Sequence, residues 1–271
     1  MPEVVTLGEP LIQLNAVSVG PLRSVVYFEK HVAGAEANFA VGAARMGLTS
    51  GLIGRVGDDE FGKCILMTLR EEGVDTTQIA VDSKGPTGVY FIQRSYPSPG
   101  KSTMFYYRSG SAASRLGPDD VKTGYVKKAS LLHLTGITPA LSDSCKAACD
   151  KALSVARQFR VKISLDTNIR PKLWSLNEAR STLLPLISTT NILLTDPEDS
   201  EILVGERNPA KAAKMLMERG PSIVVIKLGS AGSIAFSGQK AFKHRAYKVP
   251  TIDPIGAGDA FAAAFVSGAP T

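Results

Sequence analysis

The chain has 271 residues, 44% of them hydrophobic and 21% charged, which is enough to bury one sizeable core, so we expect a single α/β domain over residues 1–271. No apolar run approaches the roughly 20 residues that span a bilayer. Residues 1–5 enter a strand-like segment without the basic, apolar and cleavage regions of a signal peptide. The sequence therefore predicts a cytoplasmic protein that binds no membrane. Three cysteines and three scattered histidines predict neither a disulfide framework nor a His-based metal cluster, and the net charge of +6 comes without the basic, aromatic runs that indicate nucleic acid binding.

Short strand-like runs alternate with helical patterns from the N-terminus onward. Residues 4–7 are predicted as a first strand, and residues 36–46 as a helix that ends at Gly47. A strand at 50–56 follows, and then an amphipathic helix at 59–72 with acidic residues at its start. This alternation is typical of a mainly parallel sheet covered by helices.

Two segments, residues 11–31 and 87–109, show strand-like alternation without an intervening helix. We expect residues 87–94 and 103–108 to pair across the Pro/Ser/Gly turn at 97–100. Together the two segments predict a small β-layer, a lid, over one end of the main sheet.

The rest of the chain returns to the α/β rhythm, without an internal repeat or a low-complexity segment. Strands are predicted at 131–135, 161–166, 192–195 and 223–227. Helices are predicted at 142–159, 209–219 and 257–267.

The most informative run is DPIGAGDAF, residues 253–261, directly before the last predicted helix. Small residues let a backbone turn tightly and approach a ligand, and the unpaired N–H groups and dipole of a helix N-terminus favour a phosphate group. Asp259 would then lie beside the anion, placed to accept a hydroxyl proton. On spacing alone, the alternative that Asp259 caps the helix is equally good.

A second run, residues 57–64, satisfies Gly-x4-Gly-Lys but ends in Cys64. A Walker loop has Ser or Thr at that place to bind Mg²⁺, and the three acidic residues inside this run would repel phosphate. We therefore interpret the run as an acid-rich helix start and not as a nucleotide site.

Two motifs together resemble the signatures of the PfkB (ribokinase-like) carbohydrate kinases, namely AGAEANFA at 33–40 and GAGD at 256–259. Their order and separation match the family, and the resemblance covers essentially the whole chain. It implies a ribokinase-like three-layer α/β sandwich with a mainly parallel central sheet and a small β-sheet lid. Such lids often contact a second subunit, so a homo-oligomer formed through the lid is expected.

The resemblance also implies phosphoryl transfer from ATP, with Mg²⁺, to a small-molecule sugar or sugar acid. Asp259 would be the catalytic base. The backbone amides of Gly256, Ala257 and Gly258 would form the anion hole, and Gly34 and Asn38 would hold sugar hydroxyl groups.

Further local matches resemble one branch of the family, the 2-keto-3-deoxygluconate kinases. They are GEPL at 8–11, YYR at 106–108, GITPAL at 136–141, DTNIR at 166–170 and DPI at 253–255. In that branch the sugar-acid site is lined by the positions of Gly34, Tyr90, Tyr106, Arg108 and Arg170. The implied product is 2-keto-3-deoxy-6-phosphogluconate, phosphorylated at the terminal hydroxyl group.

The chemistry of arginine is consistent with an acidic substrate, because a guanidinium group matches the geometry of a carboxylate or a phosphate. Arg108, on the predicted lid, is the candidate for the substrate carboxylate. Arg170, after a strand end, is a candidate for either substrate or phosphate. Without the resemblance, the simpler interpretation is that Arg108 is a solvent-exposed strand residue and that Tyr106 and Tyr107 pack within the lid.

For the nucleotide, KLGSAGS at 227–233 resembles the family's ATP-binding loop, although an ordinary strand–turn connection is the alternative. The candidate ATP-binding residues are Asn168, Arg170, Thr195, Lys227, Gly229, Gly232, Gly256 and Gly258.

Two departures from the family are visible. Many relatives carry Asn-x-x-Glu after the strand that ends near Thr195, whereas residues 196–199 here are DPED, so the metal ligands stay unknown. Relatives usually continue beyond the last helix with helices that wall the adenine pocket, and we therefore expect a shortened C-terminal part.

Two alternatives remain open. A neutral-sugar kinase, of fructokinase or ribokinase type, would share the phosphate end and differ at Tyr90, Tyr106, Arg108 and Arg170. A non-catalytic sugar- or nucleotide-binding protein would share the fold, but the intact Asp259 argues against it.

Overall fold

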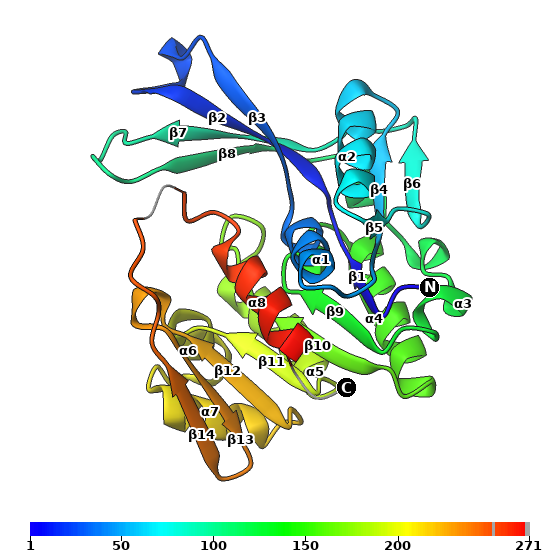
Figure 1. The fold of residues 1–271 in the computed structure, drawn as a ribbon, viewed down its shortest axis with the longest axis vertical. Coiled ribbons are helices and arrows are strands. Elements are labelled where there is room, and N and C mark those ends of the chain that lie inside the picture. Colours follow the sequence, from blue (N-terminus) through cyan, green and yellow to red (C-terminus); the bar gives the residue numbers. More distant parts are fainter. Residues whose placement is uncertain (251–252, 269–271) are drawn as a thin grey trace.

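A central sheet runs through the computed structural model, which describes residues 1–250 and 253–268 (Figure 1). Residues 251–252 and 269–271 of the predicted domain lie outside the described residues. The strand order is β14-β13-β12-β11-β10-β9-β1-β4-β5, with β6 paired to β4. All pairs are parallel except β12–β13 and β13–β14. The strands are β1 Val4–Leu7, β4 Ser50–Gly57, β5 Val74–Asp75, β6 Ile79–Asp82, β9 Leu131–Thr135, β10 Lys162–Asp166, β11 Ile192–Thr195, β12 Ile223–Lys227, β13 Ser233–Ser237 and β14 Lys240–His244.

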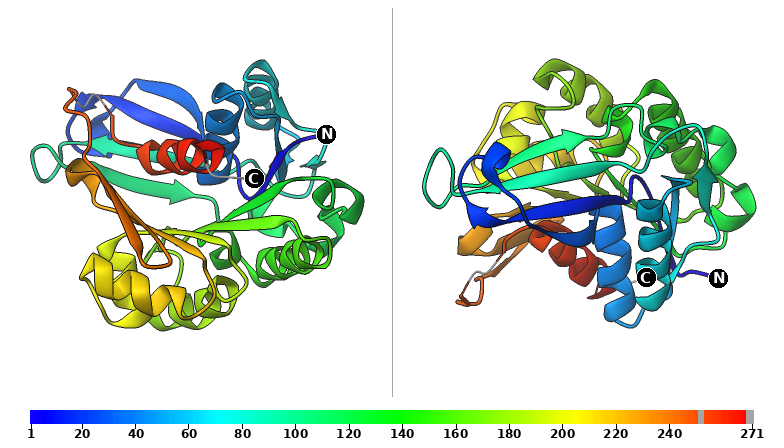
Figure 2. Two further views of the ribbon diagram at one scale, coloured as in Figure 1. Left: turned by 60° about the horizontal axis from the view of Figure 1, so that its bottom comes forward. Right: turned by 90° about the horizontal axis from the view of Figure 1, so that it is seen from above.

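Helices cover both faces of this sheet, because its parallel strands are apolar on both sides. In β11, Leu193 faces one hydrophobic cluster, while Ile192 and Leu194 face another. The cluster around Leu193 contains residues of α3 (Thr123–Val126), α4 (Asp143–Gln158), α5 (Leu176–Ile187), α6 (Pro197–Val204) and α7 (Pro209–Met217). The opposite face is covered by α1 (Ala35–Arg45) and α8 (Ala257–Gly268), and α2 (Glu60–Glu71) packs beside β4 (Figures 1 and 2). The predicted three-layer α/β sandwich is confirmed.

A separate four-stranded sheet forms the lid at one end of the molecule (Figure 1). Its order is β3-β2-β7-β8, with β2 and β7 parallel and the outer pairs antiparallel. The predicted pairing of residues 87–94 with 103–108 is confirmed, since Phe91 lies opposite Phe105. The lid strands are β2 Leu11–Val19, β3 Phe28–Ala33, β7 Val89–Arg94 and β8 Thr103–Tyr107.

Close packing between α1 and α8 brings the two sequence motifs together. A Cβ atom added to Gly42 would lie 2.8 Å from Cβ of Ala263, so the two helices approach with only small residues between them. One turn earlier on each helix lie Asn38 and Asp259, which are hydrogen-bonded. The helix contact therefore fixes the position of the last helix's first turn.

The acid-rich run at 57–64 is a helix start, as predicted. Asp59 precedes α2, and its Oδ1 accepts a hydrogen bond from the Gly62 amide at 2.8 Å. Oδ2 of Asp59 accepts from the Thr87 amide, and Lys63 forms an exposed ion pair with Glu60. Within the described part of the chain, no helix is both long and apolar enough to cross a bilayer.

Candidate active site

A cavity of about 1980 Å³ lies between the lid and the carboxyl ends of β9, β10, β11 and β12. This edge of a parallel α/β sheet is where such folds bind ligands. The start of α1 and the first turn of α8 complete its wall. The predicted site residues that line the cavity are Gly34, Asn38, Tyr90, Tyr106, Arg108, Asn168, Arg170, Lys227, Gly229, Gly256, Gly258 and Asp259.

Asp259 is the third residue of α8 and therefore lies inside the helix, not at the capping position before it. Its Oδ2 accepts a hydrogen bond of 2.8 Å from Nδ2 of Asn38. Burial raises the pKa of Asp259 to about 7, and the charges of Asp166 and Glu36 add to this rise, whereas Asn38 and Lys227 act to lower the pKa. A carboxylate with a pKa near 7 in a cavity is suited to accept a proton at neutral pH.

The loop before α8 presents amide groups to the same cavity. Gly256 has a φ of 78°, a left-handed conformation that favours glycine. The Ala257 amide donates to the Pro254 carbonyl at 3.3 Å, whereas the amides of Gly258 and Asp259 donate to no backbone carbonyl of residues 1–250 and 253–268. Free amides at a helix N-terminus bind anions, so Gly258 and Asp259 are better donors here than Ala257.

Lys227 lies at the end of β12 beside this turn. Its Nζ contacts both carboxylate oxygens of Asp166, at 2.7 and 2.6 Å, and lies 3.9 Å from the place that a Cβ atom of Gly258 would take. A buried carboxylate, 1% exposed at Asp166, therefore holds a cation next to the free amides. The sequence motifs pointed to Lys227 but not to Asp166 as its partner.

The loop after β10 places Asn168 at the cavity in a left-handed conformation, with a φ of 37°. The buried Asp199 holds this loop, because its Oδ2 accepts from Thr167 Oγ1 at 2.6 Å and from the Ile169 amide at 3.1 Å. Burial and the neighbouring charge of Asp196 raise the pKa of Asp199 to about 6. In the DPED run, the last Asp thus supports the loop while Asp196 lines the cavity.

Two predicted nucleotide-binding residues are not brought to the cavity. Thr195 is buried inside the sheet, where its Oγ1 lies 3.0 Å from Thr167 Oγ1. Gly232, with a φ of 103°, lies where a side chain would collide with the His244 carbonyl, so it serves the turn into β13. Gly229, in the same loop, does line the cavity.

The lid wall carries two stacked tyrosines. The rings of Tyr90 and Tyr106 lie 5.1 Å apart, and the Tyr90 hydroxyl donates to Oε1 of Gln13. Arg108 follows β8, and its guanidinium carbon lies 5.4 Å from the centre of the Tyr106 ring. Arg108 is not the solvent-exposed strand residue of the simpler interpretation, since it forms an ion pair with the buried Glu9.

The described residues do not form a cluster of side chains that could bind a metal ion without a substrate. Residues 1–250 and 253–268 contain no group of three or more His, Cys, Asp or Glu side chains that could hold a metal ion. Mg²⁺ in phosphoryl-transfer sites is usually held by substrate phosphates, waters and one or two carboxylates. Asp196 at the cavity wall fits that mode.

The pfkB family carbohydrate kinase model matches residues 1–271. The chain belongs to this family. The kinase is 49% identical over 269 residues to a 2-dehydro-3-deoxygluconokinase of Thermoproteus tenax, covering 98% of this chain and 82% of that protein. It is 36% identical to a 5-dehydro-2-deoxygluconokinase of Shouchella clausii, again over 98% and 82% of the two chains.

A solved structure gives the same fold. It is that of a putative ribokinase II from E. coli in complex with ATP and Mg²⁺, with a TM-score of 0.91 at 27% identity, covering 98% of this chain and 85% of that chain. The kinase therefore has a ribokinase-like fold, as the two motifs predicted.

Four carboxylates of the site were not predicted as site residues from the sequence. Glu9, Glu36, Asp166 and Asp199 are buried and act inside the protein. Glu36, for example, accepts hydrogen bonds from the hydroxyl groups of Thr135 and Thr138 at 2.5 and 2.6 Å, and burial raises its pKa. Glu9, Glu36 and Asp166 lie within the motifs named from the sequence. Their hydrogen-bond and ion-pair partners are distant in the sequence, so only the folded structure reveals them.

Proposed function

We propose that this kinase transfers the γ-phosphoryl group of ATP to the terminal hydroxyl of 2-keto-3-deoxygluconate, also called 2-dehydro-3-deoxygluconate. The observation that carries the proposal is the position of Asp259, hydrogen-bonded to Asn38 at a cavity beneath the lid. The 49% identity to a 2-dehydro-3-deoxygluconokinase supports the substrate. The ATP and Mg²⁺ complex of the ribokinase-like neighbour supports the phosphoryl donor and the metal.

Asp259 accepts the proton of the substrate hydroxyl as the oxygen attacks the γ-phosphorus. In phosphoryl transfer the protein contributes mainly position and charge stabilisation. The amides of Gly256, Gly258 and Asp259 and the cation of Lys227 stabilise the negative charge of the transferring group. Mg²⁺, bound with ATP, would neutralise phosphate charge, with Asp196 as a candidate ligand at the cavity wall.

The sugar acid lies against the lid in this proposal. Tyr90 and Tyr106 form its wall. Gly34 also lines the cavity, and its backbone packs so closely on the Glu9 carbonyl that a Cβ atom there would collide with it. Arg108 and Arg170 bind its carboxylate. Closure of the lid over the sugar excludes water that would otherwise hydrolyse ATP.

The test is coupled ADP release with a panel of substrates: 2-keto-3-deoxygluconate, its galactonate-derived epimer, 5-keto-2-deoxygluconate, fructose and ribose. We expect 2-keto-3-deoxygluconate to give the highest kcat/KM. A higher value with fructose or ribose would refute the sugar-acid assignment, and no ADP release with any sugar would favour a non-catalytic binding protein. Asp259→Asn should retain sugar binding and lose at least about a hundredfold in kcat.

We also propose that the lid joins two copies of the kinase. Its face away from the cavity carries an aromatic cluster, in which Phe91 makes edge contacts with Phe28 at 5.3 Å and Tyr107 at 5.5 Å. Tyr107 is 62% exposed, and such aromatic residues are enriched at interfaces. Light scattering should show a dimer that the Tyr107→Ser variant dissociates, and a monomeric wild-type protein at micromolar concentration would refute this.

A further inference from the structure

Glu9 and Arg108 form a buried ion pair where the lid joins the main domain. Glu9 lies between β1 and β2 with a side chain that is 1% exposed, and Arg108 directly follows β8 with a side chain that is 11% exposed. Nη2 of Arg108 contacts Oε2 of Glu9, and Ser111 Oγ donates to Oε1 of Glu9 at 2.7 Å. The segment 108–111 therefore contacts both oxygens of the carboxylate: Oε1 accepts a hydrogen bond, whereas Oε2 makes the ion-pair contact and accepts no hydrogen bond among the described residues.

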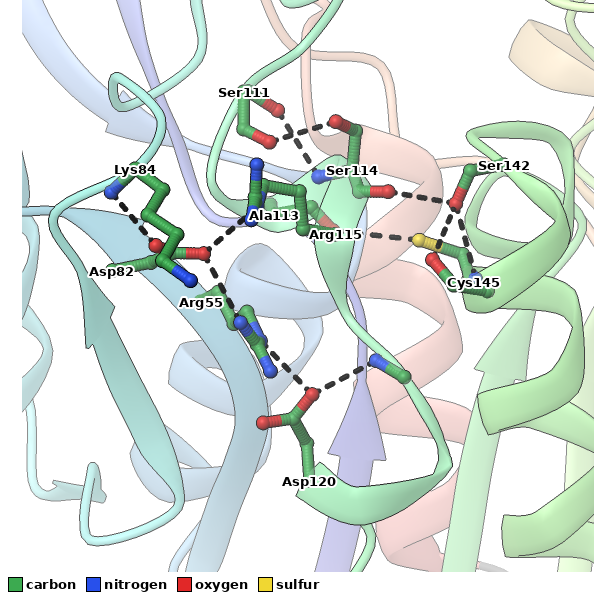
Figure 3. A network of polar contacts seen from close by, with 12 residues as sticks. Arg55, Asp82, Lys84, Ser111, Ala113, Ser114, Arg115, Asp120, Ser142 and Cys145 are labelled. Carbon is green, nitrogen blue, oxygen red and sulfur yellow. Dashed lines mark hydrogen bonds and ion pairs between the residues drawn. The ribbon is translucent and has the colours of Figure 1, made fainter.

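That segment is fixed to the main domain by a chain of serines (Figure 3). The Ser114 amide donates to Ser111 Oγ at 3.2 Å, and Ser114 Oγ donates to the Ser111 carbonyl at 2.7 Å. Ser142, which caps α4, donates from its Oγ to the Ser114 carbonyl at 2.7 Å. The backbone that follows Arg108 is thus tied to the start of a core helix.

An ionic network continues the attachment a few residues later (Figure 3). Arg115 contacts Asp82 at 3.1 Å, and Arg55 of β4 bridges Asp82 at 3.0 Å and Asp120 at 2.9 Å. The segment 108–120 is therefore held by β4, β6 and α4, all of which belong to the main domain. Arg108 therefore lies at the root of the lid, where the chain is fixed to the main domain.

Arg108 keeps donors that the ion pair does not use. Nη2 makes the ion-pair contact, and Nε is buried without an acceptor among the described residues. The side chain lines the cavity and lies against the Tyr106 ring. A Cβ atom at Gly88 would lie 2.6 Å from Oε1 of Glu9 and 3.4 Å from Cβ of Arg108, so the backbone closes the remaining side.

We propose that Glu9 is a positioning residue for the sugar acid: it fixes the Arg108 guanidinium at the lid root, so the cation is in place before substrate arrives. The inference rests on the proposed function, in which Arg108 binds the substrate carboxylate. Without Glu9 the substrate itself would have to order this long side chain, and that cost would appear as weaker binding.

The test is a double-mutant cycle in which binding of 2-keto-3-deoxygluconate is measured by calorimetry without ATP. We expect Glu9→Gln to raise Kd about tenfold, a coupling within the range for residues in contact. Arg108→Met should weaken binding at least as much, and Glu9→Gln should add nothing further in the Arg108→Met background. The Kd for ATP should stay unchanged. Glu72→Gln is the matched control, because it breaks the exposed pair with Arg45 and should leave sugar binding unchanged.

Removing one partner of a buried ion pair can unfold a protein. If Glu9→Gln does not fold, the double variant is compared with Arg108→Met, and equal Kd values support the proposal. The proposal would be overturned if Glu9→Gln bound the sugar acid with the wild-type Kd. It would also be overturned if Glu9→Gln raised the Kd by the same factor in the wild-type and the Arg108→Met backgrounds. Failure of the proposed function is separately visible, since the wild-type protein would then release no ADP with any sugar acid.

Discussion

The hydrogen bond between Asn38 and Asp259 allows a sharp test of the catalytic base. Burial raises the pKa of Asp259 to about 7, and the donor on Asn38 opposes that rise by favouring the charged carboxylate. A hydrogen bond to a charged group contributes about 1.5–3 kcal/mol. Since one pKa unit corresponds to about 1.4 kcal/mol, loss of this hydrogen bond corresponds to a rise of about one to two units in the pKa of Asp259. Water entering the space left by Asn38→Ala replaces part of the bond, so we expect a rise of about one unit.

The assay is the pH dependence of kcat/KM between about pH 5 and 9, which reports ionisations of the free enzyme. In the wild-type protein a raised pKa keeps Asp259 protonated and inactive below about pH 7, so activity should rise with pH to a midpoint near 7. In Asn38→Ala the midpoint should lie near pH 8. Asn168→Ala is the control, since this amide lines the same cavity without contacting Asp259 among the described residues, and it should leave the midpoint unchanged. An unchanged or lower midpoint in Asn38→Ala would refute the reasoning.

Three further predictions concern charges at the cavity. Asp259→Asn should melt a few degrees above the wild-type protein at pH 8, because the raised pKa of Asp259 means that its ionised carboxyl destabilises the folded state above about pH 7. The difference in melting temperature should vanish below about pH 4, where this carboxyl is protonated in both the folded and the unfolded state. Calorimetry at both pH values checks this prediction. Lys227→Met should raise KM for ATP about tenfold or more and change KM for the sugar acid little, as measured by coupled ADP release. The substitution removes the cation beside the free amides and leaves Asp166 unpaired. Arg170→Ala should raise KM for sugar acids more than for neutral sugars in the same assay, and an equal rise would contradict its contact with the carboxylate.

The bounds of the core strands could be predicted from sequence. β9, β11 and β12 have the predicted bounds, because each is a short apolar run buried on both faces and bounded by polar residues or turn residues. The hairpin of β13 and β14 was missed, because Lys240–His244 is exposed along its whole length and shows no buried period. α5 was also missed: Pro185 interrupts its helical pattern, although Ser175 and Glu178 form a capping box that could have revealed its start.

The site could be predicted only as far as local motifs reach. The glycine-rich turn before the last helix was predicted from spacing, whereas the role of Asp259 came from the family resemblance, because spacing alone left helix capping as an equal alternative. The partners of Arg108 and Lys227 could not be found in this way, because Glu9, between β1 and β2, and Asp166, at the end of β10, are distant from them in sequence and meet them only in the fold. For the same reason Thr195, the last residue of a predicted strand, could not be recognised as buried inside the sheet.

The pairing of these cations would allow one cavity to accept the two anionic substrates of the proposed reaction. Lys227 and Arg108 each contact a buried carboxylate, so neither adds a net charge to the empty cavity. A buried cation without a partner would be costly in the unbound protein, and a paired one can still offer its remaining donors to a phosphate or a carboxylate. Arg170 is exposed and makes no ion pair with the described residues. In the proposed function it would attract an incoming anion to the cavity wall, while the two paired cations would fix where each anion is held.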